Sequence, residues 1–82
     1  MNIISLNIQG LRQQAKIKWV RDLCSKHKVN FLALQETKME MVDDFLVRRL
    51  WGNTKFIFSH SASVGASGGI LCVWDPGVFI KK

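Results

Sequence analysis

The first part of the chain consists of two apolar runs separated by an amphipathic stretch. Asn2 to Ile8 carries apolar side chains on both faces of an extended strand. Gln13 to Lys28 has apolar residues at helical spacing and predicts an amphipathic helix, whose outward positions are mainly Lys16, Lys18, Arg21, Asp22 and Lys26. Val29 to Gln35 contains no Gly or Pro and predicts a buried strand. Together they predict a βαβ unit with parallel strands and a right-handed crossover.

The next stretch predicts a shorter helix over Met41 to Trp51. Its first turn is acidic and its last turn is basic, as the helix dipole favours. Gly52 follows as the residue expected to end it. The side chains expected to face the core are Val42, Phe45, Leu46 and Leu50.

Two further strands are expected in the last part of the chain. Lys55 to Ser59 predicts a strand with its phenylalanines on one face, and Ile70 to Trp74 predicts another, stopped by the turn signature Asp75-Pro76-Gly77. The Ser- and Gly-rich segment from Ser61 to Gly69 predicts a loop between them. The expected order is β-α-β-α-β-β, and the fold class is α/β.

Strands that are apolar on both faces need a covering layer on each side of the sheet. Nothing in the 82 residues supplies a second covering layer, and Val78 to Ile80 begins a segment that the sequence does not continue. We therefore expect the 82 residues to be the N-terminal part of a larger α/β domain, incomplete at its C-terminal side.

Composition narrows the class of partner. The chain has twelve Lys and Arg against six Asp and Glu, a formal net charge of +6. This excess favours polyanions such as nucleic acid, although a solvated basic surface without a partner would give the same balance. Cys24 and Cys72 fit small buried thiols of a reducing compartment rather than a disulfide framework. No apolar run reaches the length of a membrane span, and the first strand leaves no room for a signal or transit peptide, so we expect a nuclear or cytoplasmic location without membrane partners.

Polar residues end two of the apolar strands. Asn7 lies near the end of the first, and Gln35-Glu36-Thr37 ends the second. Parallel neighbours would bring Asn7 and Glu36 to the carboxyl edge of the sheet, where open α/β sheets bind ligands. A carboxylate beside a carboxamide suits a hard cation such as Mg²⁺. The alternative is that Asn7 bonds a loop backbone and Glu36 is an exposed strand-end residue.

Three segments resemble motifs of the endonuclease/exonuclease/phosphatase superfamily. They are SLNIQGL at residues 5–11, FLALQET at residues 31–37 and SGGILC at residues 67–72, and their order and spacing agree across nearly the whole chain. The chain is similar to exonuclease III and apurinic endonucleases. It most resembles the N-terminal nuclease domain of plant LINE-type retrotransposon proteins.

The resemblance implies a four-layer α/β sandwich that cleaves phosphodiesters with Mg²⁺ or Mn²⁺. It implies that Glu36 binds the metal and that Asn7 helps to organise the metal and phosphate site. The family's position two after Asn7 is often Asp or Asn, and Gln9 stands there instead. Nucleic acid, in particular DNA, is the implied partner, together with the missing C-terminal part of the domain.

The downstream motifs of the superfamily are not present in these residues. The chain has no Tyr, no Asp-x-Asn pair and no Asp-His pair. His27 is expected at a helix end and His60 in an exposed loop. We therefore expect residues 1–82 to be a partial nuclease domain that is inactive alone. The alternatives are a non-catalytic retroelement remnant or partner-binding fragment, and a small-molecule phosphoesterase of the same superfamily.

Overall fold

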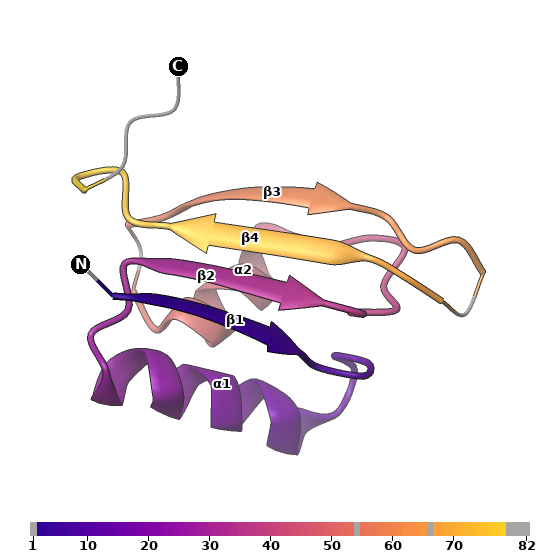
Figure 1. Ribbon diagram of the computed structural model, residues 1–82, viewed down its shortest axis with the longest axis horizontal. Helices are drawn as coiled ribbons and strands as arrows, with labels where there is room; N and C mark the ends of the chain where they lie inside the picture. Colours follow the sequence, from indigo (N-terminus) through magenta and orange to yellow (C-terminus); the bar gives the residue numbers. More distant parts are fainter. Residues whose placement is uncertain (1, 54, 66, 79–82) are drawn as a thin grey trace.

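The computed structural model describes residues 2–53, 55–65 and 67–78 (Figure 1). Its elements follow the expected order: β1 (Ile3–Asn7), α1 (Gln14–Lys26), β2 (Phe31–Gln35), α2 (Asp44–Trp51), β3 (Ile57–Ser61) and β4 (Ile70–Trp74). This confirms the α/β class and the β-α-β-α-β-β order. Residues 79–82, which hold most of the apolar segment expected to begin at Val78, lie outside the described residues.

The strands form one mixed sheet in the order β1-β2-β4-β3. β1 and β2 are parallel, as expected for a βαβ unit, and β4 is antiparallel to both β2 and β3. A parallel pair needs a crossover, and α1 supplies it. The carboxyl ends of β1 and β2 therefore lie at the same edge of the sheet as the amino end of β4 (Figure 1).

The core lies between the helices and one face of the sheet. Leu32 and Leu34 of β2 and Leu71 and Val73 of β4 are completely buried, because alternate strand residues point to the same face. The helices contribute Ile17, Val20, Cys24, Val47 and Leu50 to the same cluster. Burial of these apolar side chains holds the helices on the sheet.

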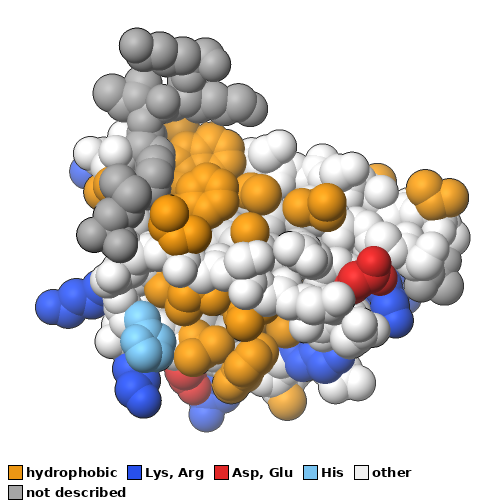
Figure 2. All heavy atoms as spheres, viewed as in Figure 1, with side chains coloured by type: hydrophobic (Ala, Val, Ile, Leu, Met, Phe, Trp, Pro, Cys, Tyr) orange, Lys and Arg blue, Asp and Glu red, His pale blue; other side chains and the backbone are white. Residues whose placement is uncertain are grey.

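The opposite face of the sheet is largely uncovered by the described residues. One row across it joins Ile3, Phe31, Trp74 and Ile57 by strand register. The side chains of Ile3 and Ile57 are 60% and 44% exposed, and the rings of Phe31 and Trp74 stack with centroids 5.9 Å apart. Figure 2 shows hydrophobic side chains gathered where β4 ends. Such a face is consistent with a sheet that takes a second layer.

Two sequence expectations about side-chain direction or position were wrong. Phe45 was expected to face the core, but it is 66% exposed, and Val47 is buried in its place. β3 begins and ends two residues later than expected, so His60 lies in a strand and not in an exposed loop. Its Nε2 atom is buried and has no hydrogen-bond partner among the described residues.

The ends of α2 explain why it forms where it does. Asp43 is the N-cap, and its side chain accepts a hydrogen bond from the Leu46 N–H at 2.9 Å. Gly52 ends the helix in the left-handed region, with φ of 76°, and its N–H donates to the Arg48 carbonyl. Glycine reaches this conformation without the steric strain that a Cβ would bring.

Removal of this cap provides a first prediction. We expect Asp43→Ala to lower the free energy of unfolding by about 1 kcal/mol, because it leaves the Leu46 N–H without its acceptor. Asp44→Ala removes the same charge in the first turn but no capping bond, so its effect should be only a few tenths of a kcal/mol. Urea unfolding followed by circular dichroism measures both variants, and equal losses would contradict the capping role.

Candidate functional site

The site expected from the sequence lies at the carboxyl edge, which we define as the edge where β1 ends at Asn7 and β2 ends at Gln35. Strand register pairs these two residues directly, so Glu36 is the first residue beyond the pair. Asn7 and Glu36 therefore come to one edge of the sheet, as the parallel pairing predicted. The structure records no hydrogen bond between their side chains within its described residues.

Backbone hydrogen bonds hold the segments after β1 and β2 together beyond the sheet. The N–H of Gly10 donates to the Glu36 carbonyl at 2.8 Å, and the N–H of Leu11 donates to the Thr37 carbonyl at 3.0 Å. On the other side, the N–H of Thr37 donates to the Gly69 carbonyl at 3.1 Å. The segment that carries Glu36 is thus bound on both flanks, and the three motif segments meet at this edge.

The backbone at this edge is unusually strained. Gln9, Glu36 and Lys38 all have positive φ, between 53° and 56°, although none of them is glycine. A left-handed conformation costs a residue with a Cβ about 1–2 kcal/mol. Residues held in such conformations cluster at functional sites, where the surrounding structure determines them.

Gly69 is required by the same packing. Its φ is 91°, and a Cβ added to it would overlap Oγ1 of Thr37, whose side chain is completely buried. The same Oγ1 accepts a hydrogen bond from the Met39 N–H at 3.4 Å. The Gly69 position therefore fixes how closely the loop before β4 approaches the segment that carries Glu36.

Each candidate side chain is oriented by one polar contact. Oε2 of Glu36, which is half-buried, accepts a hydrogen bond from the Gly68 N–H at 3.3 Å. Oδ1 of Asn7, which is exposed, accepts one from Nε2 of Gln9 at 3.0 Å. Gln9 thus orients Asn7 in this structure.

Lys16 is a residue of this edge that the sequence analysis missed. Its Nζ donates to the carbonyls of Ile8 and Gln9 at 3.0 and 2.7 Å, so it holds the loop after β1. The helical pattern placed Lys16 among the outward charges, but the amino end of α1 brings it back to this loop. No sequence signal distinguished it from the other lysines of the helix.

The donor chemistry at this edge is that of oxygen ligands. Glu36 supplies a carboxylate and Asn7 a carboxamide oxygen, both of which suit Mg²⁺. Among the residues that the structure describes, no group of three or more His, Cys, Asp and Glu side chains gathers at one place. Burial raises the pKa of the Cys24 thiol to about 11 and also raises the pKa of Cys72, so both thiols are protonated in neutral solution.

Comparison with known proteins identifies a related fold. A scan against protein-family models and a search of curated proteins found no match. Among solved structures, the chain is similar to the crystal structure of an AP endonuclease from Leishmania major, with a TM-score of 0.67 and 23% sequence identity over 96% of this chain. The match spans 25% of the AP endonuclease, so the chain corresponds to about a quarter of that protein. The described residues therefore have the α/β fold of one part of an AP endonuclease.

Proposed function

We propose that this chain is the N-terminal part of a divalent-metal-dependent phosphodiesterase that acts on nucleic acid. The observation that carries the proposal is the meeting of the three motif segments at the carboxyl edge. There, backbone bonds fix Glu36 between the loop after β1 and the loop before β4. The likeness to part of an AP endonuclease supports the nuclease class. Residues 1–82 would then be one part of a larger domain, of the kind that LINE-type retroelements encode.

Glu36 is the proposed metal ligand, and Asn7 is proposed to help position the metal and the phosphate. The contact from the Gly68 N–H orients the Glu36 carboxylate and leaves it further lone pairs for a cation. Mg²⁺ is bound in proteins by one or two carboxylates and completes its octahedron with water and phosphate oxygens. When bound, such a cation would neutralise charge that develops on a phosphodiester.

The proposed activity needs more groups than these residues hold. The chain contains no Tyr, Asp-x-Asn pair or Asp-His pair that could position the phosphate or transfer a proton. We therefore propose that it does not cleave nucleic acid alone. The second candidate is a non-catalytic remnant of such a nuclease, with which the missing motifs agree equally well.

A paramagnetic titration tests the metal site directly. We expect Mn²⁺ at low occupancy to broaden the amide signals of Asn7 and Glu36 first, because their oxygens are the proposed ligands. Glu36→Gln should abolish this preference, since it removes the charge but keeps the size of the side chain. Glu40→Gln, which makes the same charge change at an exposed position, should leave it intact.

The same titration separates the two candidate functions. Weak but selective broadening at the carboxyl edge is expected for a nuclease part whose other ligands lie elsewhere. Equal broadening at Asp43, Asp44 and Asp75 would mean that no organised site exists, which would favour the non-catalytic remnant.

A further inference from the structure

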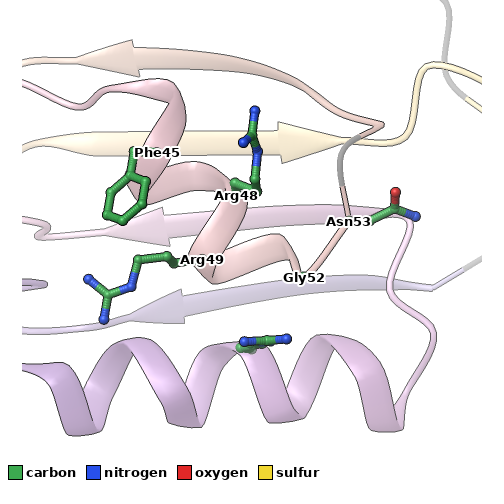
Figure 3. A pocket seen from close by; sticks show the side chains of 6 residues that line it. Phe45, Arg48, Arg49, Gly52 and Asn53 are labelled. Atoms are coloured by element: carbon green, nitrogen blue, oxygen red, sulfur yellow. The ribbon is translucent and has the colours of Figure 1, made fainter.

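A basic hollow lies on the helix layer, away from the uncovered face of the sheet. It has a volume of about 490 Å³ and is lined by Arg21 of α1 and by residues of α2 and its carboxyl end, namely Phe45, Arg48, Arg49, Gly52 and Asn53 (Figure 3). Arg21 reaches across from α1 to Gly52, where its Nε lies 3.4 Å from the position of an added Cβ. The seam between the two helices is therefore a hollow whose lining includes three arginines.

The hollow continues along the seam in both directions. Arg49 and Arg21 also line the adjoining hollows, which extend to Arg12 and Met39 at one end and to Lys28 at the other. We call the whole depression the helix groove; its charged lining residues are Arg12, Lys18, Arg21, Lys28, Arg48, Arg49, Glu40, Asp43 and Asp75. Arg12 and Met39 closely follow the motif segments, so one end of the groove lies near the carboxyl edge.

Carboxylates also line the groove, but among the described residues they do not pair with the arginines at its centre. Within the described parts of the chain, no carboxylate forms an ion pair with Arg21, Arg48 or Arg49. Arg49 donates a hydrogen bond to the neutral Gln14 side chain, and its guanidinium carbon lies 5.9 Å from the centre of the Phe45 ring. A concave surface with unpaired cations attracts anions more strongly than an isolated surface lysine does.

The directions of the side chains indicate what kind of anion fits. In Figure 3, Arg48 and Arg49 leave α2 in different directions and do not converge on one point. Separated cations match a ligand with repeated phosphates better than a single small anion. Nucleic acid supplies such phosphates at regular spacing, and Lys and Arg contacts to them dominate its affinity.

Phe45 adds a second property to the groove. Its ring is 66% exposed although it belongs to a helix whose other face is buried in the core. An exposed aromatic ring beside arginines is the arrangement on which unpaired bases stack. Bases within a duplex are already stacked on each other and do not offer their faces to such a ring.

We propose that the helix groove binds a single strand of nucleic acid, with phosphates on Arg21 and Arg48 and a base on Phe45. This site goes beyond the proposed phosphodiesterase function. It lies on the helix layer, it needs no metal, and it would hold a strand whether or not the carboxyl edge takes part in cleavage. Its end near Arg12 would lead that strand toward the edge.

The phosphate contacts are tested by binding of a fluorescent oligothymidylate of about 15 nucleotides to the 82-residue chain in EDTA, measured by anisotropy. We expect Arg21→Gln with Arg48→Gln to weaken binding about tenfold at low salt and to reduce the slope of log affinity against log salt by about 1.4, since two contacts are lost. Lys26→Gln with Lys55→Gln removes the same charge outside the groove and should change the slope little. Circular dichroism verifies that both variants keep the fold.

The stacking contact is tested separately with Phe45→Leu, which keeps an apolar side chain but removes the ring. We expect about a fivefold or greater loss of affinity with an unchanged salt slope. A duplex of the same length should bind more weakly than the single strand and should not respond to this variant.

Several outcomes would overturn the proposal. They are an unchanged salt slope in the arginine variant, an equal loss in the lysine control, and binding of the duplex as tight as that of the strand. Binding to phosphatidylserine vesicles but not to the strand, lost in the arginine variant, would assign the groove to a membrane surface instead. Because the assay contains EDTA, failure of the Mn²⁺ titration would leave this result standing, and failure here would leave the metal site standing.

Discussion

Gly69→Ala is expected to destabilise the fold by about 3 kcal/mol or more, the sum of left-handed strain and overpacking against a buried side chain. A Cβ at this position overlaps Oγ1 of Thr37 and would lie 3.2 Å from the Lys38 nitrogen. Thr37 is completely buried and cannot swing away, and the backbone nitrogen moves only with the whole segment. Urea unfolding measures the loss, and dispersion of amide NMR signals shows whether any folded protein remains.

Gly68→Ala is the matched control. Gly68 also has positive φ, at 81°, but an added Cβ would meet no atom within 4 Å. The control variant should therefore show only the strain of the left-handed conformation, about 1 kcal/mol. If both variants lost the same stability, the close approach of Gly69 to Thr37 would not be what fixes this loop.

A double variant measures the contact itself. Thr37→Ala removes the oxygen that the new Cβ would strike, so Gly69→Ala should be less destabilising in that background than in the native chain. Since the Gly69 carbonyl accepts the Thr37 N–H, the same contact also determines where the Glu36 segment lies. We therefore expect the most destabilising substitution at the carboxyl edge to be that of Gly69, which has no side chain that could bind a metal or a substrate.

The sequence alone was sufficient to predict β1, β2 and the residues of the carboxyl edge, because these depend on the local pattern of apolar and polar residues. Continuous apolar runs predict β1 and β2, and apolar residues at helical spacing predict α1. The parallel pairing of a βαβ unit then brings Asn7 and Glu36 to one edge. Register in the structure agrees, because Asn7 pairs with Gln35, the residue before Glu36. No feature of the three motif segments had to be known for this step.

Residue pattern alone could not predict which side chains of α2 face the core. Its helical part spans barely two turns, so a stripe that includes Phe45 and a stripe that includes Val47 fit the sequence about equally well. The Asp43 cap fixes where the helix begins, and packing against the core then selects Val47 and Leu50. Only tertiary packing decides such a choice, and its result leaves Phe45 exposed in the helix groove.

The position of β3 depends on pairing that is distant in sequence. Ile57 pairs with Trp74 and Ser61 with Ile70, so the extent of β3 is fixed by β4 and not by its own phenylalanines. This is why His60 lies in β3 and not in the loop that the sequence predicted. The contacts of Lys16 and Gly68 at the carboxyl edge also depend on loop conformation, which residue pattern does not encode.

Under the proposed function, cleavage should require both Glu36 and the rest of the nuclease domain. We expect no nicking of abasic plasmid DNA by the 82-residue chain alone. In a chimera in which this chain replaces the matched quarter of the AP endonuclease, Mg²⁺-dependent nicking should appear. Glu36→Gln should then lower its rate by about 10²–10³-fold, the usual effect of losing one well-placed electrostatic group.

Glu36→Gln changes the charge of the side chain but hardly its shape, so a loss of activity would come from the lost charge. Glutamine keeps the length of the side chain and an oxygen that accepts the Gly68 N–H, but it loses the negative charge that a cation needs. Asp22→Asn makes the same charge change at an exposed position outside the helix groove and should leave the nicking rate of the chimera within about twofold, as surface substitutions away from a site usually have small effects. Raising Mg²⁺ should partly rescue Glu36→Gln if the loss lies in metal affinity. A folded chimera that nicks equally well with Gln at position 36 would remove Glu36 from the metal site, and rapid cleavage by the isolated chain would contradict its assignment as one part of the domain.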